Sequence, residues 1–146
     1  AMGPEFQFHW DMLRGVRAVL SDAGLDEDTA LRLVLEARDD DDTPQIRQAL
    51  RDGYRSVFCV GDFRAAKVYH IAAQEGLRIG RDAWVCGYYD TPWVSTLHPE
   101  LTSVSIQEDR LAAVAAEAIT NHWHGEHVAI SPVLKPRASA RHEGAA

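Results

Sequence analysis

Hydrophobic positions along the chain follow two spacings, one typical of helices and one typical of buried strands. Apolar side chains at three- and four-residue intervals predict helices, and they occur in residues 11–23, 44–52, 63–75 and 107–120. Short apolar runs predict strands, and they occur in residues 31–35, 56–60, 83–87, 102–106 and 128–134. Helices that alternate with buried strands indicate an α/β fold, with a mainly parallel sheet and helices on both faces.

Residues with special backbone or capping preferences set the expected ends of these elements. Gly24 and Gly76 stand where a left-handed cap ends a helix. Asp62 precedes the helix at residue 63, so its carboxylate is expected to cap that helix. Pro132 inside the last run predicts an edge strand, and residues 138–146 are expected to form a disordered polar tail.

The helix predicted at residues 63–75 is apolar on two faces. One face carries small residues and the other includes Val68 and Ile71. A helix that is apolar on two sides needs two partners. The sheet is one partner, and the other is either a neighbouring helix or a second subunit. Val68 and Ile71 are therefore candidate contacts in a homodimer.

Composition limits the classes of function that the chain can serve. The net charge is −7 over 146 residues, so the chain offers no broad cationic surface for nucleic acid or anionic lipid. Cys59 and Cys86 lie inside apolar runs, as reduced cysteines of a cytoplasmic protein do. No apolar run approaches the length of a membrane span. Residues 1–8 are expected to be a cloning scar and tag remnant.

Three stretches occur in the order and at the separations found in one known family. They are residues 56–66 (SVFCVGDFRAA), residues 75–90 (EGLRIGRDAWVCGYYD) and residues 97–104 (LHPELTSV). An apolar strand before an Asn-Asp turn, a Gly-Leu-Arg stretch before a Gly-Tyr-Asp-Asp strand, and a Leu-x-Pro-x-Leu-Thr-Thr-Val exit are typical of LacI/GalR transcriptional regulators. The chain resembles the C-terminal part of their effector-binding domain, over about residues 10–140.

The resemblance implies a division of the chain into two parts. Residues 9–101 and 128–137 would form the C-terminal lobe of a periplasmic-binding-protein-like fold. Residues 102–127 would be a return segment that packs on an N-terminal lobe outside this chain. Operator DNA would be bound only through a helix-turn-helix that also lies outside it.

The resemblance also implies a cleft for a small-molecule effector, beyond the carboxyl ends of the strands. Relatives bind sugar hydroxyls there with an Arg, an Asn and an Asp, but this chain has Met12, Gly61 and Tyr89 at those positions. Each replacement removes a polar partner, so an effector other than a simple sugar, or a filled cleft, is expected. The remaining candidate ligand-binding residues are Asp62, Asp90 and Trp93.

Other functions fit the residues less well. The segment His122–His127 matches no closed metal-ligand spacing and reads as a solvated turn, so no metal or cofactor is expected. A phospho-acceptor receiver domain would need a lysine after a late strand, and residues 83–90 contain none. A hydrolase would need a nucleophile elbow, which is absent from the sequence, so enzyme activity is not expected. The alternative within the same fold is a periplasmic sugar-binding protein of an ABC transporter.

Overall fold

The structure, a computed structural model, describes residues 7–25 and 42–141, and the chain divides into two units after Asp42. In the first unit, helix α1 spans Gln7–Asp22 and confirms the helix predicted at residues 11–23. Gly24 follows it with a φ of 70°, as expected for a left-handed cap. The strand predicted at residues 31–35 lies outside the described residues.

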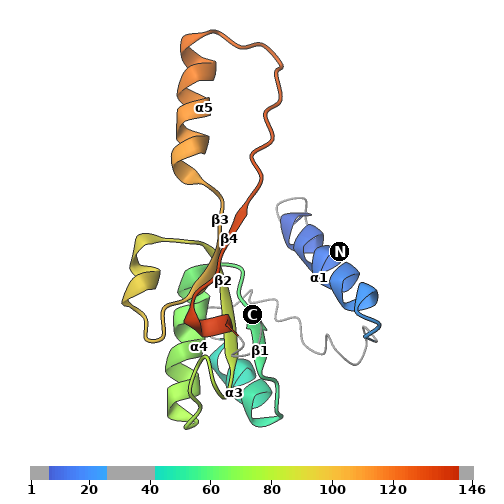
Figure 1. The fold of residues 1–146 in the computed structure, drawn as a ribbon, viewed down its shortest axis with the longest axis vertical. Helices are drawn as coiled ribbons and strands as arrows, with labels where there is room; N and C mark the ends of the chain where they lie inside the picture. The colour runs from blue at the N-terminus through green and yellow to red at the C-terminus, as the bar shows by residue number, and fades with distance from the viewer. Residues whose placement is uncertain (1–6, 26–41, 142–146) are drawn as a thin grey trace. The chain divides into compact units, whose positions relative to one another are not determined.

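The second unit is built on one four-stranded sheet (Figure 1). Its strands are β1 Ser56–Phe58, β2 Trp84–Tyr89, β3 Thr102–Ser105 and β4 Val133–Lys135. They lie in the order β1-β2-β3-β4, with the first three parallel and β4 antiparallel to β3. The prediction of an α/β fold with a mainly parallel sheet is confirmed.

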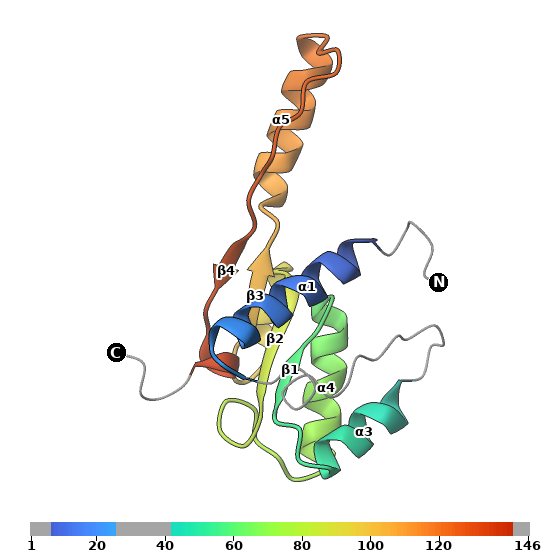
Figure 2. The same ribbon diagram turned by 90° about the vertical axis from the view of Figure 1, so that its right-hand side faces the viewer.

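Helix α4, Asp62–Gln74, packs on this sheet through β2, and helix α3, Thr43–Arg51, packs on α4 (Figure 2). The largest side chains buried between these elements include Leu50, Val68, Ile71 and Val85. The second partner of the two-sided helix is therefore α3 of the same chain.

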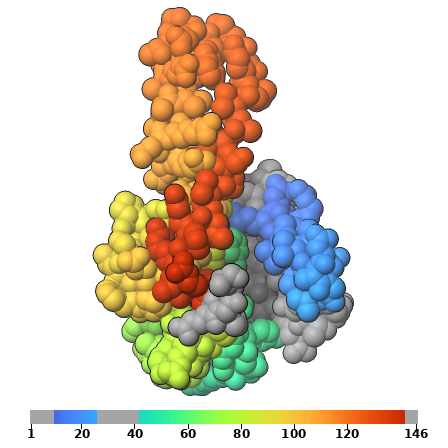
Figure 3. All heavy atoms as spheres, in the orientation of Figure 1, coloured from blue at the N-terminus to red at the C-terminus, as the bar shows by residue number. Residues whose placement is uncertain are grey.

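Helix α5, Glu108–Thr120, begins beyond the carboxyl end of β3 and buries none of its residues. The space-filling view shows it, with the segment that follows, standing clear of the sheet to which β3 and β4 belong (Figure 3). The boundary predicted after residue 101 falls too early, because β3 pairs in register with β2 over Cys86–Tyr89 and belongs to this sheet.

The chain returns from α5 to the sheet, and the 3-10 helix that follows β4 packs against the sheet. Strand β4 begins after Pro132, so this proline precedes the strand, and β4 pairs only with β3 among the described strands. The prediction of a disordered tail from residue 138 is wrong for Ala138–Ala140, which form the 3-10 helix η3. Ser139 in η3 is fully buried.

Candidate functional site

The carboxyl ends of β1 and β2 bring together most of the residues predicted to bind a ligand. β1 leads through Gly61 into α4, and β2 ends at Tyr89 and leads through Asp90 into the 3-10 helix η2, Pro92–Thr96. Because β1 and β2 are parallel, both connections lie at the same edge of the sheet.

Asp62 is buried at this edge, with 1% of its surface exposed. Its Oδ2 accepts hydrogen bonds from the backbone N–H and the hydroxyl of Thr91, both at 2.8 Å. Its Oδ1 accepts a hydrogen bond of 2.6 Å from the hydroxyl of Ser103. The carboxylate therefore ties the start of α4 to the loop after β2 and to β3.

The expected capping role of Asp62 is wrong. The N-cap of α4 is Gly61, Asp62 is the first residue of the helix, and no side-chain cap hydrogen bond is present. The carboxylate turns instead towards the sheet, where Thr91 and Ser103 supply three donors. A buried charge is retained where such donors surround it.

Gly87 makes room for this carboxylate. A Cβ atom at Gly87 would collide with Oδ1 of Asp62 and would lie 2.9 Å from Cδ2 of Leu101. Sequence analysis did not identify Gly87, Thr91 or Ser103 as part of the site. Gly87 offered a signal, since a glycine inside a strand often marks the close approach of another group.

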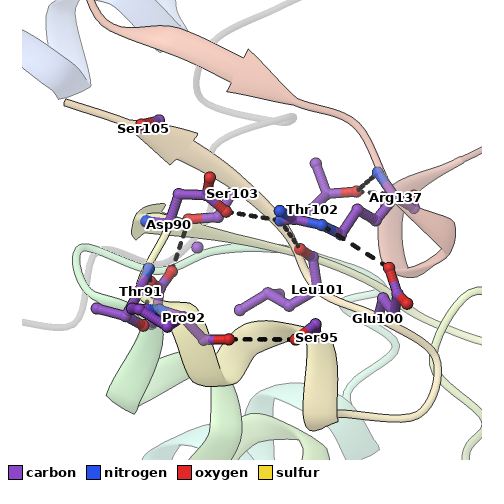
Figure 4. Close-up of polar contacts among 12 residues, drawn as sticks. Asp90, Thr91, Pro92, Ser95, Glu100, Leu101, Thr102, Ser103, Ser105 and Arg137 are labelled. Atoms are coloured by element: carbon purple, nitrogen blue, oxygen red, sulfur yellow. Dashed lines mark hydrogen bonds and ion pairs between the residues drawn. The ribbon is translucent and has the colours of Figure 1, made fainter. Parts of the chain in front are cut away.

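Asp90 is held by Arg137, which follows β4 near the end of the chain. Nη1 of Arg137 lies 2.7 Å from Oδ1 of Asp90 and donates to the backbone oxygen of Leu101 at 2.7 Å. Figure 4 shows Arg137 beside Leu101, Thr102 and Glu100 at the start of β3. The backbone N–H of Asp90 donates to the hydroxyl of Ser103 at 3.1 Å. The loop after β2 is thus fixed by both its side chain and its backbone.

The backbone of this loop is strained. Tyr89 has a φ of 104° and Asp90 a φ of 58°, a region that residues with a Cβ seldom adopt. Such strain costs on the order of 1–3 kcal/mol per residue and persists only where the surroundings hold the chain in place. The hydrogen bonds to Asp62 and Ser103 and the ion pair with Arg137 provide that hold.

The ring of Tyr89 lies beside Gly61. A Cβ atom at Gly61 would be 4.0 Å from Cε2 of Tyr89, and the φ of Gly61 is 118°. The rings of Tyr89 and Tyr88 meet edge to face, with centroids 5.1 Å apart and planes at 73°. The two positions at which relatives would carry a polar group are therefore occupied here by a bare backbone and an aromatic ring.

The remaining predicted residues lie in three places. Trp93 is in η2, which follows Asp90 along the chain, and the residue is 36% exposed. Met12 is in α1 of the first unit, so its place in a ligand site stays a prediction. Val68 and Ile71 are buried inside the second unit, so a dimer contact through this region would have to use other, exposed side chains.

The thiol of Cys86, next to Gly87 in β2, is not reactive at neutral pH. Burial and, to a lesser extent, the negative charge of Asp62 together raise the pKa of Cys86 to about 11. The thiolate is the nucleophilic form, and at neutral pH this group holds its proton. Among the described residues, no group of three His, Cys, Asp or Glu side chains is placed to hold a metal ion. The helices in the described part of the chain include none with the length and hydropathy needed to span a membrane.

Comparison with known proteins agrees with this architecture. Residues 5–142 match the family model described as periplasmic binding protein-like domain. Catabolite control protein A of Staphylococcus epidermidis is 25% identical over 126 residues, which are 86% of this chain and 38% of that protein. The chain thus spans well under half of that relative.

Solved structures of transcriptional regulators have the same fold. A LacI-family regulator from Sanguibacter keddieii superposes with a TM-score of 0.70 at 24% identity, over 86% of this chain and 50% of that one. A LacI-family regulator from Enterococcus faecium, solved with bound ribose, gives 0.71 at 20% identity, over 88% of this chain and 50% of that one. The family match, the parallel sheet and the relatives together show that the chain belongs to the periplasmic-binding-protein-like domain family and resembles its LacI-type regulators.

Proposed function

We propose that this chain is the C-terminal lobe of the effector-binding domain of a LacI-type transcriptional regulator, which senses a small molecule and performs no catalysis. The observation that carries the proposal is the match of residues 5–142 to the periplasmic-binding-protein-like family, combined with the regulators among its relatives. The effector site is assigned to the sheet edge formed by Gly61, Asp62, Tyr89, Asp90 and Trp93. The protein acts in the cytoplasm.

Helix α5 supports the same proposal. The helix carries an apolar stripe that includes Leu111, Val114 and Ile119, and none of its residues is buried in this chain. An exposed stripe of this kind marks a contact surface. In the proposed regulator, residues 106–127 pack on the N-terminal lobe, and α5 supplies the apolar face of that contact.

The protein is proposed to act as a homodimer that binds operator DNA through a segment outside this chain. Since Val68 and Ile71 are buried, the contact between subunits is assigned to the exposed residues of α4 and to residues 92–101. Sedimentation of the chain at tens of micromolar tests this: a mass near twice 16.2 kDa is expected, and a monomer mass would contradict it.

DNA binding separates this function from that of a transport protein. A longer gene product that carries the proposed DNA-binding segment should shift a specific DNA fragment selected from random sequence. The 146-residue chain is the matched control and should shift none, because its net charge is −7 and phosphate contacts need cations. A signal peptide upstream, with no specific shift, would favour a periplasmic binding protein of a transporter instead.

A further inference from the structure

We propose that the sheet edge beside Gly61 and Tyr89 binds its ligand through a flat apolar face, such as an aromatic ring, and not through a set of sugar hydroxyls. The proposal rests on the proposed function, which assigns a small-molecule effector to this edge. Two observations carry it. The carboxylates of the edge are already engaged within the chain, and the ring of Tyr89 lies where a sugar would need a polar partner.

The two carboxylates of the edge are engaged within the chain. Both oxygens of Asp62 accept hydrogen bonds from Thr91 and Ser103, and 1% of the residue is exposed. Asp90 pairs with Arg137 at 2.7 Å. A sugar hydroxyl has little access to Asp62, because the residue is buried and three of its acceptor sites already serve Thr91 and Ser103.

The backbone conformation at Gly61 favours glycine, so the lack of a polar side chain there follows from the shape of the turn. Its φ of 118° lies in a region that L-residues rarely adopt, so the turn between β1 and α4 is built for glycine. An asparagine at this position would be strained in the present backbone, whatever space its side chain found.

Tyr89 supplies an exposed ring at the same place. Its backbone is fixed by the hydrogen bonds of its neighbours, and its ring is braced edge to face by Tyr88. It remains 38% exposed, although it lies beside Gly61. A rigid ring with a free face binds another flat apolar surface well, because little conformational entropy is lost.

The neighbouring exposed side chains have the same chemistry. Phe63, in the first turn of α4, is 77% exposed, and Trp93 in η2 is 36% exposed. Phe63 directly follows Asp62, and Trp93 lies three residues after Asp90, so both belong to the two connections that form this edge. The surface of the edge is thus aromatic, while its carboxylates are buried or paired.

A matched pair of probes tests this on the 146-residue chain. Phenyl β-D-glucoside and methyl β-D-glucoside share the sugar and differ in the ring, and each is titrated while the NMR signals of Tyr89 and Gly61 are followed. The phenyl compound is expected to bind with a Kd about tenfold lower than the methyl compound. Tyr89→Phe keeps the ring and should keep that preference, whereas Tyr89→Ala should abolish it with the remaining amide signals unchanged.

Several results would overturn the inference. These are equal or reversed Kd values for the two glucosides, no saturable shift with either, or an unaltered preference in Tyr89→Ala. Specific DNA binding by the longer gene product is measured without any glucoside, so it tests the proposed function separately. A product that binds DNA specifically while the chain prefers methyl β-D-glucoside would contradict the ligand class alone.

Discussion

Nη1 of Arg137 lies 2.7 Å from Oδ1 of Asp90, although the two residues are 47 positions apart in the chain. Arg137 belongs to the segment after β4, and Asp90 belongs to the loop that carries Tyr89. The side chains are 23% and 14% exposed. The guanidinium therefore links the segment after β4 to the sheet edge at which a ligand is proposed to bind.

Removing this guanidinium should destabilise the second unit strongly. Arg137→Met leaves the carboxylate of Asp90 largely buried and unpaired, which is expected to cost about 2–4 kcal/mol in the free energy of unfolding. Arg78→Met is the matched control, because its ion pair with Asp82 is 61% exposed on the arginine side, and it should cost less than about 1 kcal/mol. Urea unfolding measures both, and equal losses would contradict the assigned role.

Two glycine-to-alanine substitutions should change stability in opposite directions. Gly87→Ala places a methyl group against Asp62 and Leu101, so overpacking should lower stability by about 1–3 kcal/mol. Gly15→Ala, inside α1 with no atom within 4 Å of the new Cβ, should stabilise its helix by about 0.5–1 kcal/mol. Thermal unfolding followed by circular dichroism compares them, and a neutral Gly87→Ala would show that the space beside Asp62 is larger than described.

Ser139 should stabilise the sheet, because its hydroxyl bonds to both β2 and β3. Its hydroxyl donates to the backbone oxygen of Val85 at 2.6 Å and accepts from the backbone N–H of Thr102 at 2.7 Å. Ser139→Ala leaves both buried groups without this partner and should cost about 1–3 kcal/mol. Faster hydrogen exchange at the Thr102 amide is the local readout. Ser95→Ala, which removes an exposed hydroxyl bonded to Pro92, should change stability by less than about 0.5 kcal/mol.

The contact between α3 and α4 should depend on pH. Hydrogen bonds from Arg51 and Arg47 lower the pKa of Glu75 below its ordinary value of 4.5. A carboxyl with a lowered pKa in the folded state stabilises the fold above the unfolded value, and this contribution is lost as the pH falls through the folded value. The stability difference between the natural chain and Glu75→Gln should therefore shrink once the pH drops below 4.5.

The two arginines provide the control for that pH dependence. With Arg47→Met and Arg51→Met together, Glu75→Gln should no longer alter the acid limb of the stability curve. The measurement is the urea midpoint across the acidic range. A difference that stays constant down to the acid transition would mean that the arginines do not act on this carboxyl.

Alkylation should report the raised pKa of the partly buried Cys86. In a Cys59→Ser variant, the rate of reaction of Cys86 with iodoacetamide should keep rising with pH towards about 11, because the thiolate is the reactive form. A rate that levels off near 9.0, the ordinary pKa of a thiol, would contradict the burial of Cys86 and the influence of Asp62.

The elements of the fold could be predicted from the sequence because their signals are local. The helical spacing before Gly24 and the small-residue helix after Gly61 each follow from residues within two turns of one another. Strand lengths were less well predicted: β4 covers Val133–Lys135, while the apolar run extended over residues 128–134. A run of apolar residues shows that a segment can pair, but the partner strand decides where pairing ends.

The candidate site was predicted in part, and the remainder depends on contacts between distant residues. Gly61, Asp62, Tyr89, Asp90 and Trp93 stand at one sheet edge because parallel strands bring their carboxyl ends together. The partners of Asp62 lie 29 and 41 residues away, and no local pattern links them to it. The capping role failed for this reason, since Thr91 and the buried Ser103 supply the donors for both carboxylate oxygens.

The burial of Ser139 has a consequence for the order in which the protein is made. Synthesis runs from the N-terminus, so Val85 and Thr102 emerge before the residue whose hydroxyl bridges them. Until residues 133–139 have been added, the sheet can hold β1, β2 and β3, but it lacks both β4 and the serine whose hydroxyl joins Val85 to Thr102. A nascent chain that stalled before residue 133 would expose the side of β3 on which β4 pairs to proteases and chaperones, and synthesis of residues 133–139 would cover it.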